Sequence, residues 1–183
     1  MATSSAKIDN LKIELRKLTV YERMSEETTA FVAEVYVNGV NVAHAKNDGH
    51  GGSTYYHGYP EPEKKLILTT AEAYCLALPS IKYGAEHGMK PFELPMNLEH
   101  FIDDLVTAEL NKKADKKLEK KMTNHIMWGI KGGSTYTQMK FGKPFIPAHR
   151  AQLQTYIDTQ IKPTMKKGEV ILNTNLETLG VII

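Results

Sequence analysis

The dipeptide Asn38-Gly39 constrains the fold most, because it stands between two segments that have the composition of β-strands. Asn and Gly both tolerate the positive φ angles that a two-residue hairpin turn requires. Thr29–Val37 before it is rich in Phe, Val and Tyr, and Val40–Lys46 follows it. Upstream, Ile8–Val20 alternates apolar and charged residues, which predicts a half-buried strand. Residues 8–46 therefore predict an antiparallel meander of three strands.

Two helices are expected after the meander. Thr69-x-x-Glu72 has the form of a capping box, which predicts that a helix opens there and is stopped by Pro79. Residues 80–96 contain several Gly and Pro and predict irregular structure. Asn97 is then expected to cap a long helix over residues 97–123.

The second half of this long helix has an unusual apolar spacing. Leu110, Ala114, Leu118 and Met122 follow one another in steps of four residues. Each step drifts about 40° around an α-helix, so a straight helix cannot keep all four on one face. We expect a bend or break near Asn111, or a helix that wraps around its core.

The remaining chain predicts a hairpin, a helix and a short strand. Residues 124–130 and 135–141 flank a turn at Lys131-Gly132-Gly133, residues 148–161 are expected to be helical, and 169–172 to form a strand. The order β-β-β-α-α-β-β-α-β predicts the α+β class, with an antiparallel sheet and packed helices. We expect a single α+β domain over 1–183, with a flexible N-terminus at 1–6.

The composition excludes several classes of protein. Among 183 residues, 42% are hydrophobic and 24% are charged, and the net charge is +2, as in an ordinary globular domain that is not broadly basic. Cys75 is the single cysteine, which excludes a disulfide within the chain and favours a reducing compartment. No apolar run is long enough to cross a membrane, and residues 1–6 lack the features of a signal peptide. We expect a cytoplasmic protein with no membrane partner.

The pentapeptide Gly-Gly-Ser-Thr-Tyr occurs twice, at Gly51–Tyr55 and at Gly132–Tyr136. Backbone amides of glycine can approach an anion closely, hydroxyls can bind it, and aromatic rings can stack on a base. We predict that both copies meet over one ligand. The predicted ligand-binding residues are Lys46, Asn47, Asp48, Gly49, His50, Gly51, Gly52, Ser53, Thr54, Tyr55, Tyr56, His57, Trp128, Lys131, Gly132, Gly133, Ser134, Thr135 and Tyr136.

Neither copy matches a known catalytic or nucleotide-binding signature. The P-loop and the Gly-x-Gly-x-x-Gly fingerprint are absent, as are the spacings of common zinc sites. The sequence therefore predicts no cofactor, no metal site and no catalytic residue. A wide turn without function is the alternative for the first copy and a plain hairpin tip for the second, while Asp48, His50 and His57 could supply acid–base chemistry to an enzyme.

Residues 112–121 carry six lysines and two acidic residues. On a helix the lysines form two adjacent basic stripes, which could contact nucleic acid. The segment contains no Arg and no aromatic residue, so we favour a solvated helix face and treat nucleic acid as the less favoured partner.

Several segments together carry a family resemblance. They are Asn47–Gly52, Leu94–Glu99 before Ile102–Val106, the lysine-rich helix with the hairpin after it, and Ile171–Asn173. This arrangement resembles a family of small hypothetical proteins carried by phages and other bacterial mobile elements. The resemblance implies a genetic context and assigns no catalytic residues.

The context shapes the functional hypotheses. Small phage proteins often act by binding, either to host immune proteins or to nucleotides that signal host defence. We expect a non-catalytic protein that sequesters a phosphorylated, nucleotide-like molecule in the host cytoplasm, as an anti-defence sponge. The alternatives are a protein–protein inhibitor of a host defence component and a phosphodiesterase-like enzyme, and a homo-oligomer is expected because the apolar tail at 179–183 could add to a partner.

Overall fold

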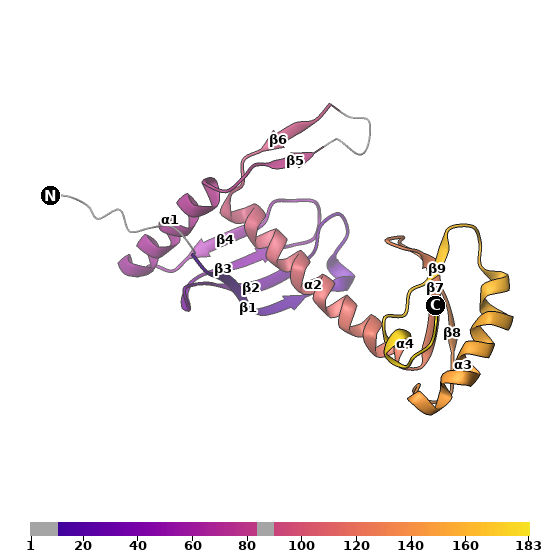
Figure 1. Ribbon diagram of the computed structural model, residues 1–183. Helices are drawn as coiled ribbons and strands as arrows, with labels where there is room; N and C mark the ends of the chain where they lie inside the picture. The colour runs from indigo at the N-terminus through magenta and orange to yellow at the C-terminus, as the bar shows by residue number, and fades with distance from the viewer. Residues whose placement is uncertain (1–10, 84–89) are drawn as a thin grey trace. The chain divides into compact units, whose positions relative to one another are not determined.

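The computed structural model describes residues 11–83 and 90–183 and has the expected α+β architecture (Figure 1). The chain forms two compact units, residues 1–110 (unit 1) and residues 111–183 (unit 2), where the sequence led us to expect one domain. Helix α2, Leu98–Met122, contributes residues to both. Each unit has a core of its own. The sequence contains no linker-like segment between the units, so it did not indicate this division.

Unit 1 contains a four-stranded antiparallel sheet whose strands follow chain order. The strands are β1 (Ile13–Val20), β2 (Phe31–Val37), β3 (Val40–Asn47) and β4 (Tyr55–Gly58), with a short 3-10 helix, η1, at Glu22–Met24. Asn38 and Gly39 have φ angles of 49° and 84°, so the predicted hairpin turn is confirmed. Strand β4 was not among the predicted strands, and it forms by pairing with Ala43–Lys46 of β3.

Two helices cover one face of this sheet. Helix α1, Pro62–Leu76, contributes Leu68, Ala71 and Cys75 to the core, and α2 contributes Leu98, Ile102 and Val106. They pack against the inward-facing residues of β2 and β3, of which Val35 and Ala43 are fully buried. The helices and the sheet thus make two layers.

The helix ends differ in how well the sequence predicted them. Asn97 caps α2 as expected, with its Oδ1 accepting a hydrogen bond of 2.8 Å from the His100 amide. Helix α1 begins at Pro62, so the prediction that Thr69 opens it was wrong; proline at the first helical turn sets φ and lacks only a donor that would be unpaired there. Helix α2 runs without interruption through Asn111, so it does not break there.

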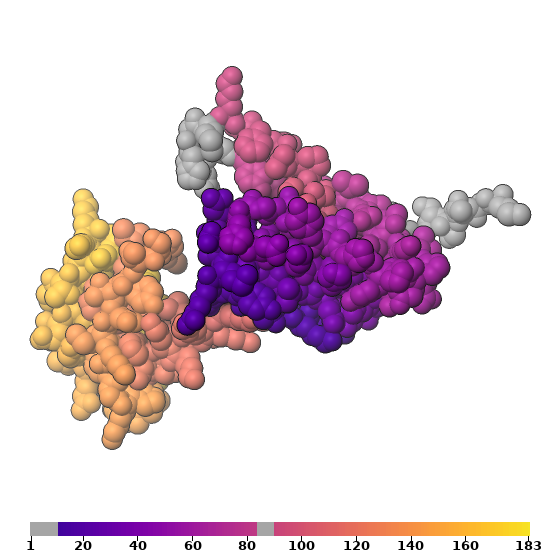
Figure 2. Space-filling view, turned by 180° about the vertical axis from the view of Figure 1, so that it is seen from behind, coloured from indigo at the N-terminus to yellow at the C-terminus, as the bar shows by residue number. Residues whose placement is uncertain are grey.

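A small hairpin follows α1 within the segment that we expected to be irregular. Strands β5 (Ile81–Tyr83) and β6 (Phe92–Leu94) are antiparallel, and Tyr83 and Phe92 stack with ring centroids 5.3 Å apart. The hairpin projects from the rest of unit 1 (Figures 1 and 2).

Unit 2 packs a three-stranded antiparallel sheet against short helices. Strands β7 (His125–Ile130), β8 (Thr137–Lys140) and β9 (Glu169–Ile171) lie in the order β8-β7-β9, which confirms the predicted hairpin and strand. The helical segments are η2 (Pro147–His149), α3 (Arg150–Tyr156), the π-helical η3 (Ile157–Ile161), η4 (Lys162–Thr164) and α4 (Asn175–Thr178). Ile126, Leu153, Ile157 and Leu176 form the centre of its core.

Asn173 holds unit 2 together and is 1% exposed. Its Oδ1 accepts a hydrogen bond from the Met127 amide at 2.6 Å, and its Nδ2 donates to the His125 carbonyl at 2.7 Å. Asn175 Nδ2 donates to the Met122 carbonyl at 2.9 Å and so satisfies an acceptor at the end of α2. Asn173 therefore has a structural role.

The apolar C-terminal tail is partly used inside unit 2. Val181 is buried in the core beside Leu176, whereas Ile182 and Ile183 are exposed. The predicted self-association through this tail stays a prediction. Within the described ranges, no helix combines the length and hydropathy needed to cross a bilayer.

Candidate functional site

The first Gly-rich loop, residues 47–54, is folded around the side chain of Asn47, which is 7% exposed. Asn47 Oδ1 accepts hydrogen bonds from the Gly49 amide at 2.8 Å and from Thr28 Oγ1 at 2.9 Å. Its Nδ2 donates to the Gly52 carbonyl at 3.0 Å and to Thr54 Oγ1 at 3.1 Å. Because all of these hydrogen bonds are internal, the loop has a fixed conformation without a ligand.

Gly49 fastens this loop to the segment before β2. Its φ is 90°, and its carbonyl accepts hydrogen bonds from the amides of Glu26, Glu27 and Thr28 at 3.0–3.3 Å. A Cβ at Gly49 would collide with the Met24 carbonyl oxygen, so only glycine fits. We predicted that the Gly49 amide binds phosphate; in the structure it donates to Asn47 instead.

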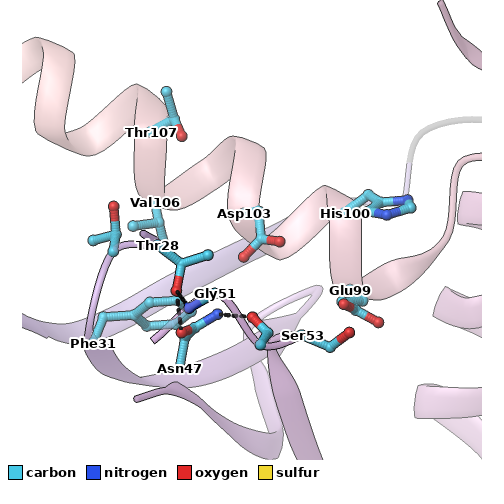
Figure 3. Close-up of a pocket in the computed structure, with 12 residues that line it drawn as sticks. Thr28, Phe31, Asn47, Gly51, Ser53, Glu99, His100, Asp103, Val106 and Thr107 are labelled. Carbon is cyan, nitrogen blue, oxygen red and sulfur yellow. Dashed lines mark hydrogen bonds between the residues drawn. The ribbon is translucent and has the colours of Figure 1, made fainter. Parts of the chain in front are cut away.

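A cavity of about 360 Å³ lies between this loop and the first turns of α2 (Figure 3). The loop side of the cavity is formed by Asn47, Gly51, Gly52 and Ser53, together with Thr28 and Thr29. The helix side is formed by Glu99, His100, Asp103, Val106 and Thr107, and Phe31 adds an apolar wall. Figure 3 shows Asp103 projecting from α2 toward the loop.

Asp103 is half-buried in the wall of this cavity. Its Oδ1 accepts a hydrogen bond of 2.6 Å from Thr54 Oγ1, which links α2 to the Asn47 network. Burial raises the pKa of Asp103, and the Thr54 hydrogen bond opposes this shift. His100 Nδ1 is also buried, and it has no hydrogen-bond partner among the described residues. The cavity thus presents a desolvated carboxyl on its helix side.

The electrostatic character of the cavity is acidic. Glu99 and Asp103 line it, and none of its lining residues is Lys or Arg. Two of the predicted ligand-binding residues, Lys46 and His50, have acidic partners that do not line the cavity: Lys46 Nζ lies 3.4 Å from Asp48 Oδ1, and His50 Nδ1 lies 3.1 Å from Glu26 Oε2. A phosphate placed deep in this cavity would be repelled by the two carboxylates.

The other predicted residues of the first copy lie on β4 or beside it. Tyr55 is 65% exposed, and the His57 ring lies 5.5 Å from that of His44. The Tyr56 hydroxyl donates a hydrogen bond of 2.8 Å to Glu72 Oε1. Burial, together with this hydrogen bond, raises the pKa of Tyr56 to about 12. The three side chains do not line the cavity.

The second copy belongs to unit 2 and the first to unit 1, so the prediction that they share a ligand stays a prediction. Gly132 has a φ of 78° in the turn between β7 and β8, and residues 131–140 are exposed. Trp128, which we expected to stack on a ligand, is 7% exposed and belongs to the core of unit 2.

The sequence predicted that the loop over residues 47–54 binds a ligand, but it did not predict that α2 forms the opposite wall of the cavity. Of the adjacent acidic residues Asp103 and Asp104, Asp104 is exposed, but Asp103 is half-buried. Glu99, Asp103 and Thr107 stand four residues apart, so they share a face of α2. The polar stripe formed by these three residues, beside the apolar face of α2, was the sequence feature that could have indicated the helix side of the site.

No family model, no curated protein and no solved structure matches the chain. Within residues 11–83 and 90–183, no group of three or more His, Cys, Asp or Glu side chains is placed to hold a metal ion.

Proposed function

We propose that unit 1 is a non-catalytic binding module whose cavity takes the hydroxyl-rich end of a small molecule, the nucleoside part of a nucleotide. The observation that carries the proposal is the half-buried Asp103 carboxyl on the wall of a preformed cavity. A carboxylate is an acceptor for the hydroxyl groups of a ribose, as in dinucleotide-binding folds. A desolvated carboxylate without enough donors is costly, and a ligand that donates to it lowers that cost.

The size and rigidity of the cavity suit such a ligand. Its volume of about 360 Å³ lies within the range of small-molecule sites. The Asn47 network holds the loop in place beforehand, so binding requires little ordering. The polar lining of the cavity, which includes Thr28, Ser53 and Thr107, can exchange hydrogen bonds with ligand hydroxyls.

The acidic charge of the cavity indicates how a bound nucleotide would be oriented. Glu99 and Asp103 disfavour phosphate inside, so the phosphorylated end of a nucleotide would extend toward solvent. This differs from the sequence-based hypothesis, in which the glycine amides bind the phosphate.

A binding role is favoured over an enzymatic one by the placement of the candidate acid–base residues. Asp48 contacts Lys46, His50 contacts Glu26, and His57 faces His44, so these residues have separate partners. A binder without chemistry would act by sequestration, as an anti-defence sponge does in the host cytoplasm. A phage origin and a cytoplasmic location are part of the proposal.

Thermal unfolding against a ligand panel tests the proposal. The panel contains ribose, nucleosides, linear and cyclic nucleotides, and inorganic phosphate. A ligand that binds only the folded chain raises the midpoint. We expect a shift with a nucleoside and its nucleotides and none with inorganic phosphate.

Gly52→Val provides the site variant, because a Cβ at Gly52 meets nothing within 4 Å, so the chain keeps its fold while the cavity is narrowed. Gly142→Val in unit 2 is the matched control, since Gly142 is equally open. The shift should vanish in the first and persist in the second. No shift with any compound, or a shift that survives Gly52→Val, contradicts the proposal.

A further inference from the structure

The two units carry opposite charge. Residues 1–110 hold 10 Lys and Arg against 16 Asp and Glu, a net charge of −6. Residues 111–183 hold 13 against 5, a net charge of +8. The overall charge of +2 hides this division, which coincides with the boundary between the compact units. A charge of +8 on 73 residues is typical of a module that binds a polyanion.

Lys117 and Lys121 of α2 lie on the same surface of unit 2 as Tyr136. Lys121 Nζ donates a hydrogen bond of 3.4 Å to Gln138 Oε1 on β8 and lies 5.9 Å from the centroid of the Tyr136 ring. A hollow of about 360 Å³ is lined by Ala114, Asp115, Lys117, Leu118, Lys121 and Tyr136. Lys117 and Lys121 stand one helical turn apart and therefore share a face.

Tyr136 supplies the aromatic surface that the lysine-rich helix lacks. It ends the second Gly-Gly-Ser-Thr-Tyr copy and is 41% exposed, next to β8, whose four residues are all exposed at the edge of the sheet. An exposed ring beside an ammonium group can stack on an unpaired base while nearby lysines contact the flanking phosphates. Residues 112–121 contain neither Arg nor an aromatic residue, and the loop before β8 supplies the missing aromatic ring.

We propose that this surface of unit 2 binds single-stranded nucleic acid without sequence preference. Lys117 and Lys121 contact phosphates, and a base stacks on Tyr136. Lysine is a point charge without the bidentate geometry of arginine, so base-specific readout is not expected. Duplex bases are stacked within the helix and cannot use Tyr136, which favours the single strand. The inference does not rest on the cavity of unit 1.

Fluorescence anisotropy with the full chain tests the inference. The probes are a labelled 20-nucleotide DNA of mixed sequence, the RNA of the same sequence, the DNA duplex, and heparin as a competitor. We expect both single strands to bind more tightly than the duplex, with an affinity that falls steeply between 50 and 200 mM salt.

Three variants separate the contributions. Tyr136→Ala should weaken single-strand binding about five- to a hundredfold and leave the salt dependence unchanged, because it removes stacking alone. Lys117→Gln with Lys121→Gln should reduce the slope of log affinity against log salt by about 1.4. Lys166→Gln with Lys167→Gln removes the same charge outside the hollow and should have a smaller effect. Trp128 emission, which reports the core of unit 2, confirms that each variant is folded.

Absence of binding at 50 mM salt would overturn the inference. So would equal effects of the two lysine pairs, because charge alone would then explain binding. Tighter binding to the duplex than to the single strands would overturn the assignment to single strands. The assignment would also be overturned if heparin bound as tightly as the single strands and Tyr136→Ala left single-strand binding unchanged.

Discussion

Asp103 connects stability and binding at the scale of a single residue. Burial raises its pKa, so the folded chain holds this proton more tightly than the unfolded chain does. The contribution of Asp103 to stability therefore falls as pH rises from its ordinary value of 3.8 through the raised value. Asp103→Asn removes the ionisation and keeps an oxygen for Thr54. We expect the variant to be more stable than the wild type at pH 7, with a smaller difference at pH 4, by urea unfolding.

The same substitution should weaken ligand binding, because a neutral amide is a poorer acceptor for a ligand hydroxyl than a carboxylate. In the wild type, binding should also weaken as pH falls through the raised pKa of Asp103. Titration of the thermal shift from pH 7 to pH 4 measures this loss. For the stability prediction, a difference in the free energy of unfolding between Asp103→Asn and the wild type that is the same at pH 4 and pH 7 would contradict the burial cost assigned to Asp103.

At the scale of an element, the loop over residues 47–54 depends on one amide side chain. Asn47→Ala removes four hydrogen bonds and leaves the buried Gly49 amide without its acceptor. We expect a loss of about 2–4 kcal/mol in the free energy of unfolding, measured by urea, together with loss of the ligand shift.

Asn41→Ala is the matched control on the same strand, β3. Asn41 Oδ1 is buried and has no hydrogen-bond partner among the described residues, so its removal costs little. Equal destabilisation by the two substitutions would show that the Asn47 network does not hold the loop.

At the scale of the whole molecule, residues 11–83 and 90–183 form two cores that share no residue. The core of unit 1 extends from Ile13 to Val106, and that of unit 2 from Ile126 to Val181. Residues 111–121 of α2, which lie between these cores in the sequence, include no buried residue. We expect the units to unfold in separate transitions, unit 2 at the lower urea concentration because it has the smaller core.

One native probe reports each unit. Cys75 is buried in unit 1, and burial raises the pKa of its thiol to about 11, so it should resist thiol reagents until unit 1 opens. Trp128, the single tryptophan, reports unit 2 by fluorescence. Coincident midpoints of thiol labelling and fluorescence would mean that the chain unfolds as one cooperative unit.

The sequence by itself determined the features that depend on local backbone geometry. Asn38-Gly39 fixed the β2–β3 hairpin, Asn97 fixed the start of α2, and Lys131–Gly133 fixed the β7–β8 turn. In each case a few adjacent residues set φ or satisfy nearby amides, so no distant partner is needed. The first Gly-rich loop was found for the same reason, since its glycines and Asn47 are neighbours in the chain.

Only the tertiary structure decided which distant residues meet. It placed Glu99, His100 and Asp103 opposite the Gly-rich loop, paired β4 with β3, and buried Trp128 in a core instead of leaving it to stack. It also brought Tyr136 beside Lys121. Such contacts arise when apolar faces of separate elements are removed from water together, and the pattern of one segment does not specify the partner against which it packs.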